Sequence, residues 1–251
     1  MAKQKGIIKL EGTIGDITFY KSPDGILAKG KGGIPANRIA NDPAFQRTRE
    51  NGFEFGRAGN AGKVLRNAIR GLLQNSSDRL VVSRLTTEMV KVIQEDITNP
   101  RGLRNVIDGE AELLEGFEFN IRGKLGTCLY APYSSTIDRI AGTLTANIPA
   151  FIPSNMIAAP SGTTHYKIVS AGAEIDFEKE AFLVDAQETA ILPWDNVATP
   201  GINLANAVTA NSTLPMFLVL GITFYQDVNG QKYPLKNGAY NSLSIVKVQG
   251  V

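Results

Sequence analysis

The stretch "NDPAFQRTRENGFEFGRAGNAGKVLRNAIRGLL", residues 41 to 73, changes the sequence from a strand pattern to a helical one. Asp42 before Pro43 is typical of a helix start, because an aspartate side chain can cap free amides and proline lacks the amide that would be unpaired there. A break is expected near Gly52. Apolar residues at helical spacing predict the buried face of this segment: Phe45, Phe53, Phe55, Val64, Leu65, Ile69, Leu72 and Leu73. A second helix is predicted from about Ser77 to Glu95, with these residues inward: Leu80, Val81, Leu85, Met89, Val90 and Ile93.

The residues before this stretch have a strand pattern. "GIIKLEGTIGDITFYKSPDGILAKGK", residues 6 to 31, predicts a β-meander, with Gly12 to Asp16 as one connection and Ser22 to Gly25 as a type I turn. Residues 29 to 43 are rich in glycine and contain two prolines, which indicates an extended connector. Three short strands bury too little to stand alone, so we expect this arm, residues 1–31, to lie on another sheet, on the helices or on a neighbouring subunit.

The residues after Gly109 have a strand pattern as far as residue 251. Asn229-Gly230 is the clearest hairpin turn, because both residues tolerate a positive φ. The sequence therefore predicts an α+β chain with an arm (1–31), a connector and helical region (32–107) and an antiparallel β-sandwich (108–251). The predicted strands are Gly116 to Arg122, Thr127 to Ala131, Ala141 to Ile148, His165 to Ala171, Ala173 to Asp185, Thr189 to Leu192, Leu214 to Asp227, Gln231 to Pro234 and Asn241 to Val248.

The charges are divided unevenly between the two parts of the chain. Residues 1–107 contain 18 Lys and Arg against 10 Asp and Glu, a net charge of +8; residues 108–251 contain 8 against 14, a net charge of −6, and the sum is +2. Such an asymmetry indicates a basic surface for an acidic partner. That partner is either nucleic acid or the other part of a neighbouring copy.

The helical stretch also contains glycines and basic residues that invite comparison with a phosphate-binding loop. The pattern fails, because Arg57 stands where the first glycine is required and Val64 stands where a hydroxyl residue should hold magnesium. Five arginines form a predicted basic face that is suited to phosphate or to the acidic part of another subunit, unless they are simply solvated: Arg47, Arg49, Arg57, Arg66 and Arg70.

Few side chains in the sequence suit catalysis. His165 and Cys128 are the only residues of their types, no signature links them, and a lone cysteine forms no internal disulfide. Known metal-binding spacings are absent, and we expect neither a metal nor a cofactor. The alternating acids Glu174, Asp176, Glu178 and Glu180 could bind a cation or a basic partner, although a solvent-facing row is commoner. An enzyme that acts on carbohydrate through two carboxylates remains an alternative.

The first seventy residues, "KGIIKLEGTIGDITFYKSPDGILAKGKGG" and then "RIANDPAFQRTRENGFEFGRAG", resemble an uncharacterised bacterial family that begins with this β-meander and Arg/Asn/Phe helix. The order of arm, helices and sandwich also resembles structural proteins of virions and phage-like particles. The arm, the connector, the opposite charges of the two parts and the scarcity of catalytic side chains favour a non-enzymatic, self-assembling subunit of such a particle. The apolar stretch near the N-terminus is too short for a signal peptide, so we expect synthesis in the cytoplasm. No membrane span is expected from the sequence.

The partners expected for such a subunit are other copies of the chain and other particle proteins. A nucleic-acid-binding protein that uses its basic N-terminal part is the alternative function. Another possibility is that the meander completes the chain's own sandwich. The residues predicted to form the assembly interface are apolar or aromatic side chains of the arm: Ile7, Ile8, Leu10, Ile17, Phe19 and Tyr20.

Overall fold

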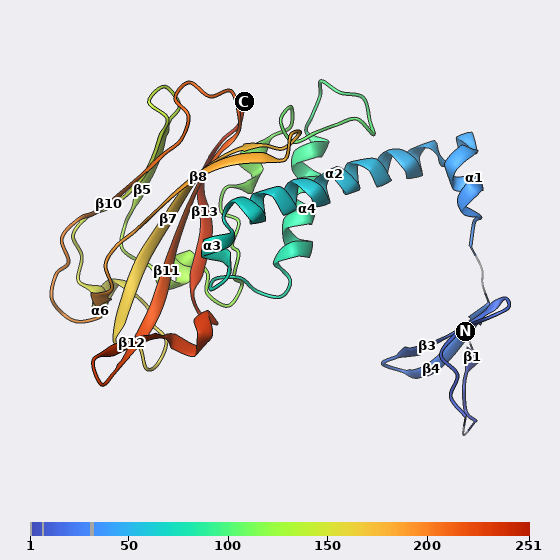
Figure 1. Cartoon of the computed structure of the whole chain (residues 1–251), viewed down its shortest axis with the longest axis horizontal. Coiled ribbons are helices and arrows are strands. Elements are labelled where there is room, and N and C mark those ends of the chain that lie inside the picture. Colours follow the sequence, from blue (N-terminus) through green and yellow to red (C-terminus); the bar gives the residue numbers. More distant parts are fainter. Residues whose placement is uncertain (1, 7, 31–32) are drawn as a thin grey trace. The chain divides into compact units, whose positions relative to one another are not determined.

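The computed structural model describes residues 2–6, 8–30 and 33–251 and shows a mixed α+β chain made mostly of strands (Figure 1). The chain divides into two compact units, Met1–Arg49 and Glu50–Val251, which we call unit 1 and unit 2. This division lies near the start of a long helix, whereas the sequence placed its boundaries after residues 31 and 107. None of the helices in the described ranges is long and apolar enough to cross a membrane.

Unit 1 contains a four-stranded antiparallel sheet, the arm sheet, in the order β1-β4-β3-β2. Its strands are β1 (Ala2–Lys3), β2 (Gly12–Ile14), β3 (Ile17–Ser22) and β4 (Gly25–Gly30), and they are followed by α1 (Ala36–Asn41) and the 3-10 helix η1 (Pro43–Phe45). The predicted turn from Ser22 to Gly25 is confirmed. The predicted connection from Gly12 to Asp16 was too long, because Gly15 takes a φ of 57° and two residues suffice to reverse the chain.

Helix α1 precedes the predicted cap, which forms at the start of η1. Asp42 Oδ1 accepts a hydrogen bond from the Ala44 amide at 2.9 Å, with Pro43 in the first turn of η1. Helix α2 (Gln46–Ala68) then continues through Gly52, so the predicted break is wrong. The other helices of this region are α3 (Arg70–Leu73), α4 (Val81–Gln94) and the 3-10 helix η2 (Ala111–Leu114).

Three of the apolar residues predicted to face inward are exposed. Phe53 and Phe55 are 62% and 63% exposed, because the buried face of α2 begins only with Glu54 and Ala58. Leu80 precedes the first residue of α4 and is also exposed. The buried faces of both helices otherwise match the prediction at these positions: Val64, Leu65, Ile69, Leu73, Val81, Leu85, Met89 and Ile93.

Unit 2 contains two antiparallel sheets in a sandwich-like arrangement. The small sheet has the order β10-β6-β5 and consists of β5 (Ser134–Asp138), β6 (Thr143–Ile148) and β10 (Ile202–Ala207). The large sheet has the path β12-β11-β7-β8, with β13 paired to β11 and β9 paired to β7. Its strands are β7 (His165–Asp176), β8 (Ala181–Glu188), β9 (Leu192–Pro193), β11 (Met216–Val228), β12 (Gln231–Pro234) and β13 (Ser242–Gln249).

Two predicted strands of this region are not strands. Residues 116–122 form a loop with one isolated bridge, Glu118 to Ser244, and Thr127 lies in the short helix α5 (Leu125–Cys128). The turn at Asn229-Gly230 is confirmed, with φ angles of 54° and 82°. The remaining short helices are α6 (Pro153–Met156) and η3 (Leu235–Gly238).

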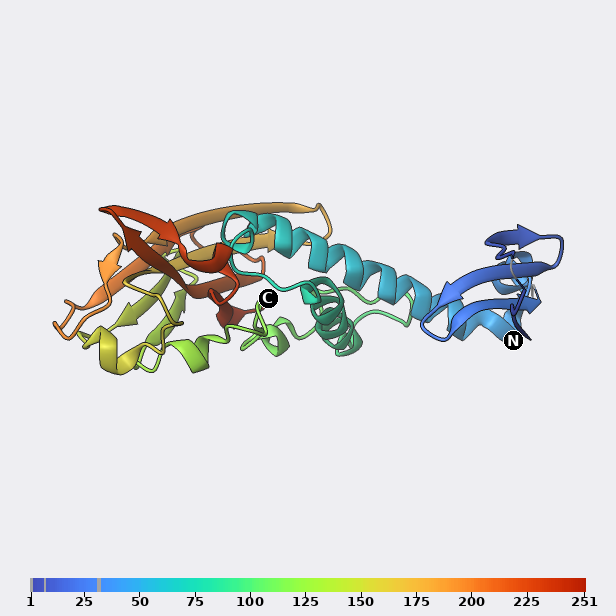
Figure 2. The ribbon, with the colours of Figure 1, turned by 90° about the horizontal axis from the view of Figure 1, so that it is seen from below.

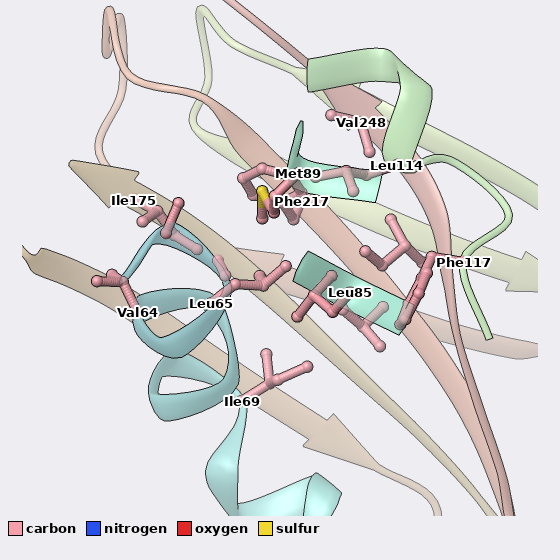
Figure 3. Packing of buried hydrophobic residues seen from close by; sticks show 14 of the residues in the cluster. Val64, Leu65, Ile69, Leu85, Met89, Leu114, Phe117, Ile175, Phe217 and Val248 are labelled. Carbon is pink, nitrogen blue, oxygen red and sulfur yellow. The ribbon is translucent and has the colours of Figure 1, made fainter. Parts of the chain in front are cut away.

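The large sheet is the middle layer of unit 2, with a separate apolar cluster on each face. One face packs against α2 and α4, where Leu65, Leu85 and Phe217 are fully buried (Figure 3). The ribbon can be followed from below in Figure 2, where α4 is seen nearly end-on. The other face packs against the small sheet through side chains such as Leu144 and Leu218. Unit 2 therefore has a complete core within one chain.

Candidate functional site

The arm sheet has one apolar face, and its strand pairing shows which residues share it. Ile14 pairs with Ile17, and Phe19 pairs with Ala28. Directly opposite residues of antiparallel strands project from the same side, and alternate residues share a side. The apolar face, which we call the arm face, therefore consists of Ile14, Ile17, Phe19, Ile26 and Ala28.

The opposite face of the arm sheet, which we call the polar face, has mostly polar side chains together with Leu27, which lies opposite Tyr20. The hydroxyls of Thr13 and Thr18 lie 3.2 Å apart and form a cross-strand hydrogen bond. The ammonium group of Lys29 lies 5.4 Å from the centre of the Tyr20 ring, within the range of a cation–π contact. The sheet is therefore amphipathic, like a sheet that has solvent on one side and a core on the other.

Among the described residues of unit 1, none forms a buried core against the arm face. None of the described residues before Glu54 is buried. Ile14 is 61% exposed and Ile17 is 47% exposed. Sheets of three or more strands are stable when an apolar face is buried. The exposed arm face is consequently the feature of this chain that most requires an explanation in terms of function.

The predicted interface residues are only partly brought together. Ile17 and Phe19 both belong to the arm face, but Tyr20 lies on the polar face because adjacent residues of a strand point in opposite directions. Ile8 and Leu10 are exposed and precede β2 rather than lying in a strand; the Gln4 side chain binds the Leu10 backbone through both its amide oxygen and its amide nitrogen. Ile7 lies outside the described residues.

The sequence analysis missed three residues of the arm face: Ile14, Ile26 and Ala28. The sequence did contain a signal for these residues. If the β2–β3 and β3–β4 turns are each limited to two residues, each turn fixes the register of its hairpin, and the register shows which residues share a face with Ile17 and Phe19.

The predicted basic face is not a single surface. Arg57 and Arg66 are nine residues apart in α2, which is two and a half turns, so they project from opposite sides of the helix. Arg49 donates to the carbonyl oxygens of Ile39 and Asp42 at 2.7 and 2.9 Å and so fixes the segment between α1 and α2. Two of the five arginines, Arg49 and Arg57, thus have local structural partners.

Arg57 holds a loop onto α2. Its Nη1 donates to the carbonyl oxygens of Gly102 and Arg104 at 3.2 and 2.9 Å, while the buried Glu54 accepts the Gly102 amide at 2.9 Å. The guanidinium of Arg66 is partly buried, and burial lowers its pKa. Arg47 and Arg70 are the two predicted basic-face residues with exposed side chains.

The predicted acidic row is also divided. Glu174 is buried and accepts hydrogen bonds from the Ser212 hydroxyl at 2.7 Å and the Thr209 amide at 3.0 Å. Burial opposes ionisation, but these hydrogen bonds outweigh it and lower the pKa of Glu174. Glu178 and Glu180, in contrast, are exposed in the turn between β7 and β8.

Strand β8 ends the path of the large sheet and is exposed over most of its length (Figure 1). Its neighbouring side chains Phe182 and Leu183 are 46% and 48% exposed. An edge strand presents amide and carbonyl groups that are not paired within its sheet, and it can accept another segment of chain. We call residues 173–190, which include β8 and its acidic residues, the acidic edge.

A cleft of about 430 Å³ lies between α4 and residues 113–124, and several of its charged side chains have hydrogen-bond or ion-pair partners. Arg84 donates to the Glu118 carbonyl at 2.7 Å and lies over the Phe117 ring, while Glu88 pairs with Lys91 at 2.8 Å. Burial raises the pKa of the Glu118 carboxyl, which accepts the Leu125 amide. These contacts fix the 113–124 segment against α4.

The two residues singled out for nucleophilic or acid–base chemistry lie in ordinary environments. His165 shares a hydrogen bond of 2.9 Å with the Thr164 hydroxyl at the start of β7. Cys128 is buried in α5, and burial raises the pKa of its thiol. Among the residues that the structure describes, no three His, Cys, Asp or Glu side chains are grouped so that they could hold a metal ion.

No protein-family model matches the sequence, and no curated protein and no solved structure matches the chain. The resemblance to a bacterial family and to particle proteins therefore stays a prediction. The arguments about function below rest on the geometry of the arm face and the acidic edge.

Proposed function

We propose that this chain is a non-enzymatic structural subunit that assembles with copies of itself into a larger particle or filament of virion-like or phage-derived type. The observation that carries the proposal is the arm face, because it is apolar and no described residue of unit 1 is buried, whereas unit 2 has its own core. Within this proposal, the two sheets of unit 2 form a β-sandwich that serves as the rigid body of the subunit, and the helices before it link it to the arm.

The energetics favour a covered arm face. Burying an isoleucine side chain fully contributes about 1.5–3 kcal/mol, so covering the exposed halves of Ile14 and Ile17 contributes about 2 kcal/mol together. Phe19 and Ile26 add smaller amounts because they are already partly buried. Such a surface suits contact with another protein, and the acidic edge and arm give each copy two different surfaces for such contacts.

The first experiment is a measurement of mass by light scattering after gel filtration, at low and at moderate salt, with large fractions viewed by negative-stain electron microscopy. We expect defined oligomers, rings or filaments whose stability falls as salt rises. A nucleic-acid absorbance peak that travels with the protein would instead support the alternative, a nucleic-acid-binding protein that uses the basic N-terminal part.

A pair of neighbouring substitutions tests the arm face directly. Ile17→Glu places a charge on the arm face, and Thr18→Glu places the same charge on the polar face one residue later. We expect Ile17→Glu to reduce the mass to that of a monomer while Thr18→Glu assembles as the unchanged protein does. Equal masses for all three proteins would refute assembly through the arm face.

A further inference from the structure

We infer that the arm face of one copy docks on the acidic edge of the next copy, so that subunits join head to tail. The inference rests on the proposed function and adds the identity of the receiving surface. It commits to a second copy of this chain as the partner that covers the exposed Leu183 side chain on β8.

Charge complementarity is the first argument. The arm, residues 1–31, contains six lysines against Glu11, Asp16 and Asp24, a net charge of +3. The acidic edge, residues 173–190, contains six acidic residues, of which Glu174 and Asp176 are buried. Its surface therefore has Glu178, Glu180, Asp185 and Glu188 against Lys179, a net charge of −3. An arm that met another arm would bring like charges together, whereas an arm on the acidic edge brings opposite charges together.

The arrangement of charges around the apolar residues agrees with this pairing. Lys21 lies opposite Ile26 in the arm sheet and is exposed on the same side as the arm face. Glu178 and Glu180 lie in the turn that leads directly into β8. Leu183 and Phe182 are adjacent in β8 and project from opposite faces of the large sheet, so the acidic edge presents one exposed apolar side chain on each face, with exposed acidic residues close by in the chain.

The two edges of the large sheet differ in their availability. The outer side of β13 is bonded to the 116–119 segment, because the Gly116 and Phe119 amides donate to the Ile245 and Leu243 carbonyl oxygens at 2.7 and 2.8 Å. Strand β8 pairs with β7 on one side and ends the sheet on the other. A contact from the small sheet reaches β8: the side-chain amide of Asn206 donates a hydrogen bond to the backbone carbonyl oxygen of Asp185 at 3.0 Å. The stretch around Phe182 and Leu183 is the exposed part of this edge.

Head-to-tail docking makes a specific prediction about mixtures, because every copy has one arm face and one acidic edge. Ile17→Glu removes the arm face, and Leu183→Lys adds a positive charge to the acidic edge. Each variant alone is expected to be monomeric. A mixture of the two still contains one intact arm face and one intact acidic edge, and these can join one copy of each variant and no more.

The test is light scattering of each variant and of their equimolar mixture. We expect about 27 kDa for each variant and a mixed species of about 54 kDa, twice the mass of the 27.0 kDa chain. The control Ile140→Lys makes the same change at an exposed apolar residue outside the acidic edge, 76% exposed against 48% for Leu183, and is expected to assemble fully. Unchanged far-ultraviolet circular dichroism and thermal melting of Leu183→Lys establish that its fold is retained.

The outcomes separate the two proposals. If Leu183→Lys assembles like the unchanged protein while Ile17→Glu does not, self-assembly through the arm face stands and the acidic edge is rejected as its receptor. If both variants are monomeric but the mixture shows no 54 kDa species, the head-to-tail contact is also rejected. If the unchanged protein is itself monomeric, the proposed function fails together with this inference.

Discussion

Gly59 in helix α2 provides a stability test whose sign follows from the structure. A methyl group added at Gly59 would have no heavy atom within 4 Å apart from the backbone of its own helical turns. Alanine is favoured over glycine in a helix interior by about 0.8–1 kcal/mol. We therefore expect Gly59→Ala to raise the free energy of unfolding by about 1 kcal/mol.

Gly172 in β7 is the matched position at which the same substitution has the opposite sign. A methyl group there would lie 2.8 Å from Asn206 Cβ and 3.3 Å from Leu144 Cβ, both on the small sheet. Contacts this short force the two sheets apart, and overpacking of this kind costs about 1–3 kcal/mol. We expect Gly172→Ala to lower the free energy of unfolding by that amount.

The assay is urea unfolding followed by far-ultraviolet circular dichroism, at two protein concentrations so that any contribution of association is visible. A change of 1 kcal/mol corresponds to about 2–4 °C in Tm for a chain of this size. A lower urea concentration at the unfolding midpoint for Gly59→Ala would show that this side of α2 is covered. An unchanged midpoint for Gly172→Ala would refute the close approach of the two sheets.

Two further predictions concern buried charged groups in unit 2. Arg139 donates to the Ser212 and Leu214 carbonyl oxygens at 2.6 and 2.9 Å and also to the C-terminal segment. Arg139→Lys keeps the charge but loses the planar guanidinium, so we expect it to lower the free energy of unfolding by about 1–3 kcal/mol. An unchanged temperature of thermal unfolding would contradict this prediction. Asp96 is fully buried, and although burial opposes its ionisation, hydrogen bonds from Asn99 and its neighbours hold its pKa below the ordinary value. Because the pKa of Asp96 is lower in the folded than in the unfolded chain, the stabilisation it provides is present above about pH 4 and is lost as the pH falls through the folded pKa. Asp96→Asn should therefore lower the free energy of unfolding at pH 7 and make that free energy less dependent on pH in acid. The same dependence of unfolding free energy on pH in both proteins would refute this.

The local features of this fold could be predicted from the sequence because short-range chemistry decides them. Asp42 and Pro43 begin η1 as expected, and the turns at Pro23-Asp24 and Asn229-Gly230 form where residue types that favour turns occur. The inward residues of α4 follow from helical periodicity.

The arrangement of side chains in space was less predictable, because it depends on distant parts of the chain. Phe53 and Phe55 were expected to be buried because they are apolar and fit a helical spacing. The loop that covers this end of α2 packs against Glu50 and Glu54, and both phenylalanines are exposed. Arg57 was expected to be on a binding surface, but its partners are the carbonyl groups of residues 102 and 104, more than forty positions away. Sequence spacing within one helix contains no information about such contacts.

The distribution of buried residues is the basis on which we propose assembly. Unit 2 buries apolar side chains on both faces of its large sheet, so its stability does not require a partner. The arm sheet has the alternation of a half-buried sheet but nothing buried, and a sheet of that kind gains its missing core only when another surface covers it. A cover supplied by a second copy would make formation of the arm's core depend on protein concentration, and the mass of the unchanged protein at several concentrations would reveal that dependence.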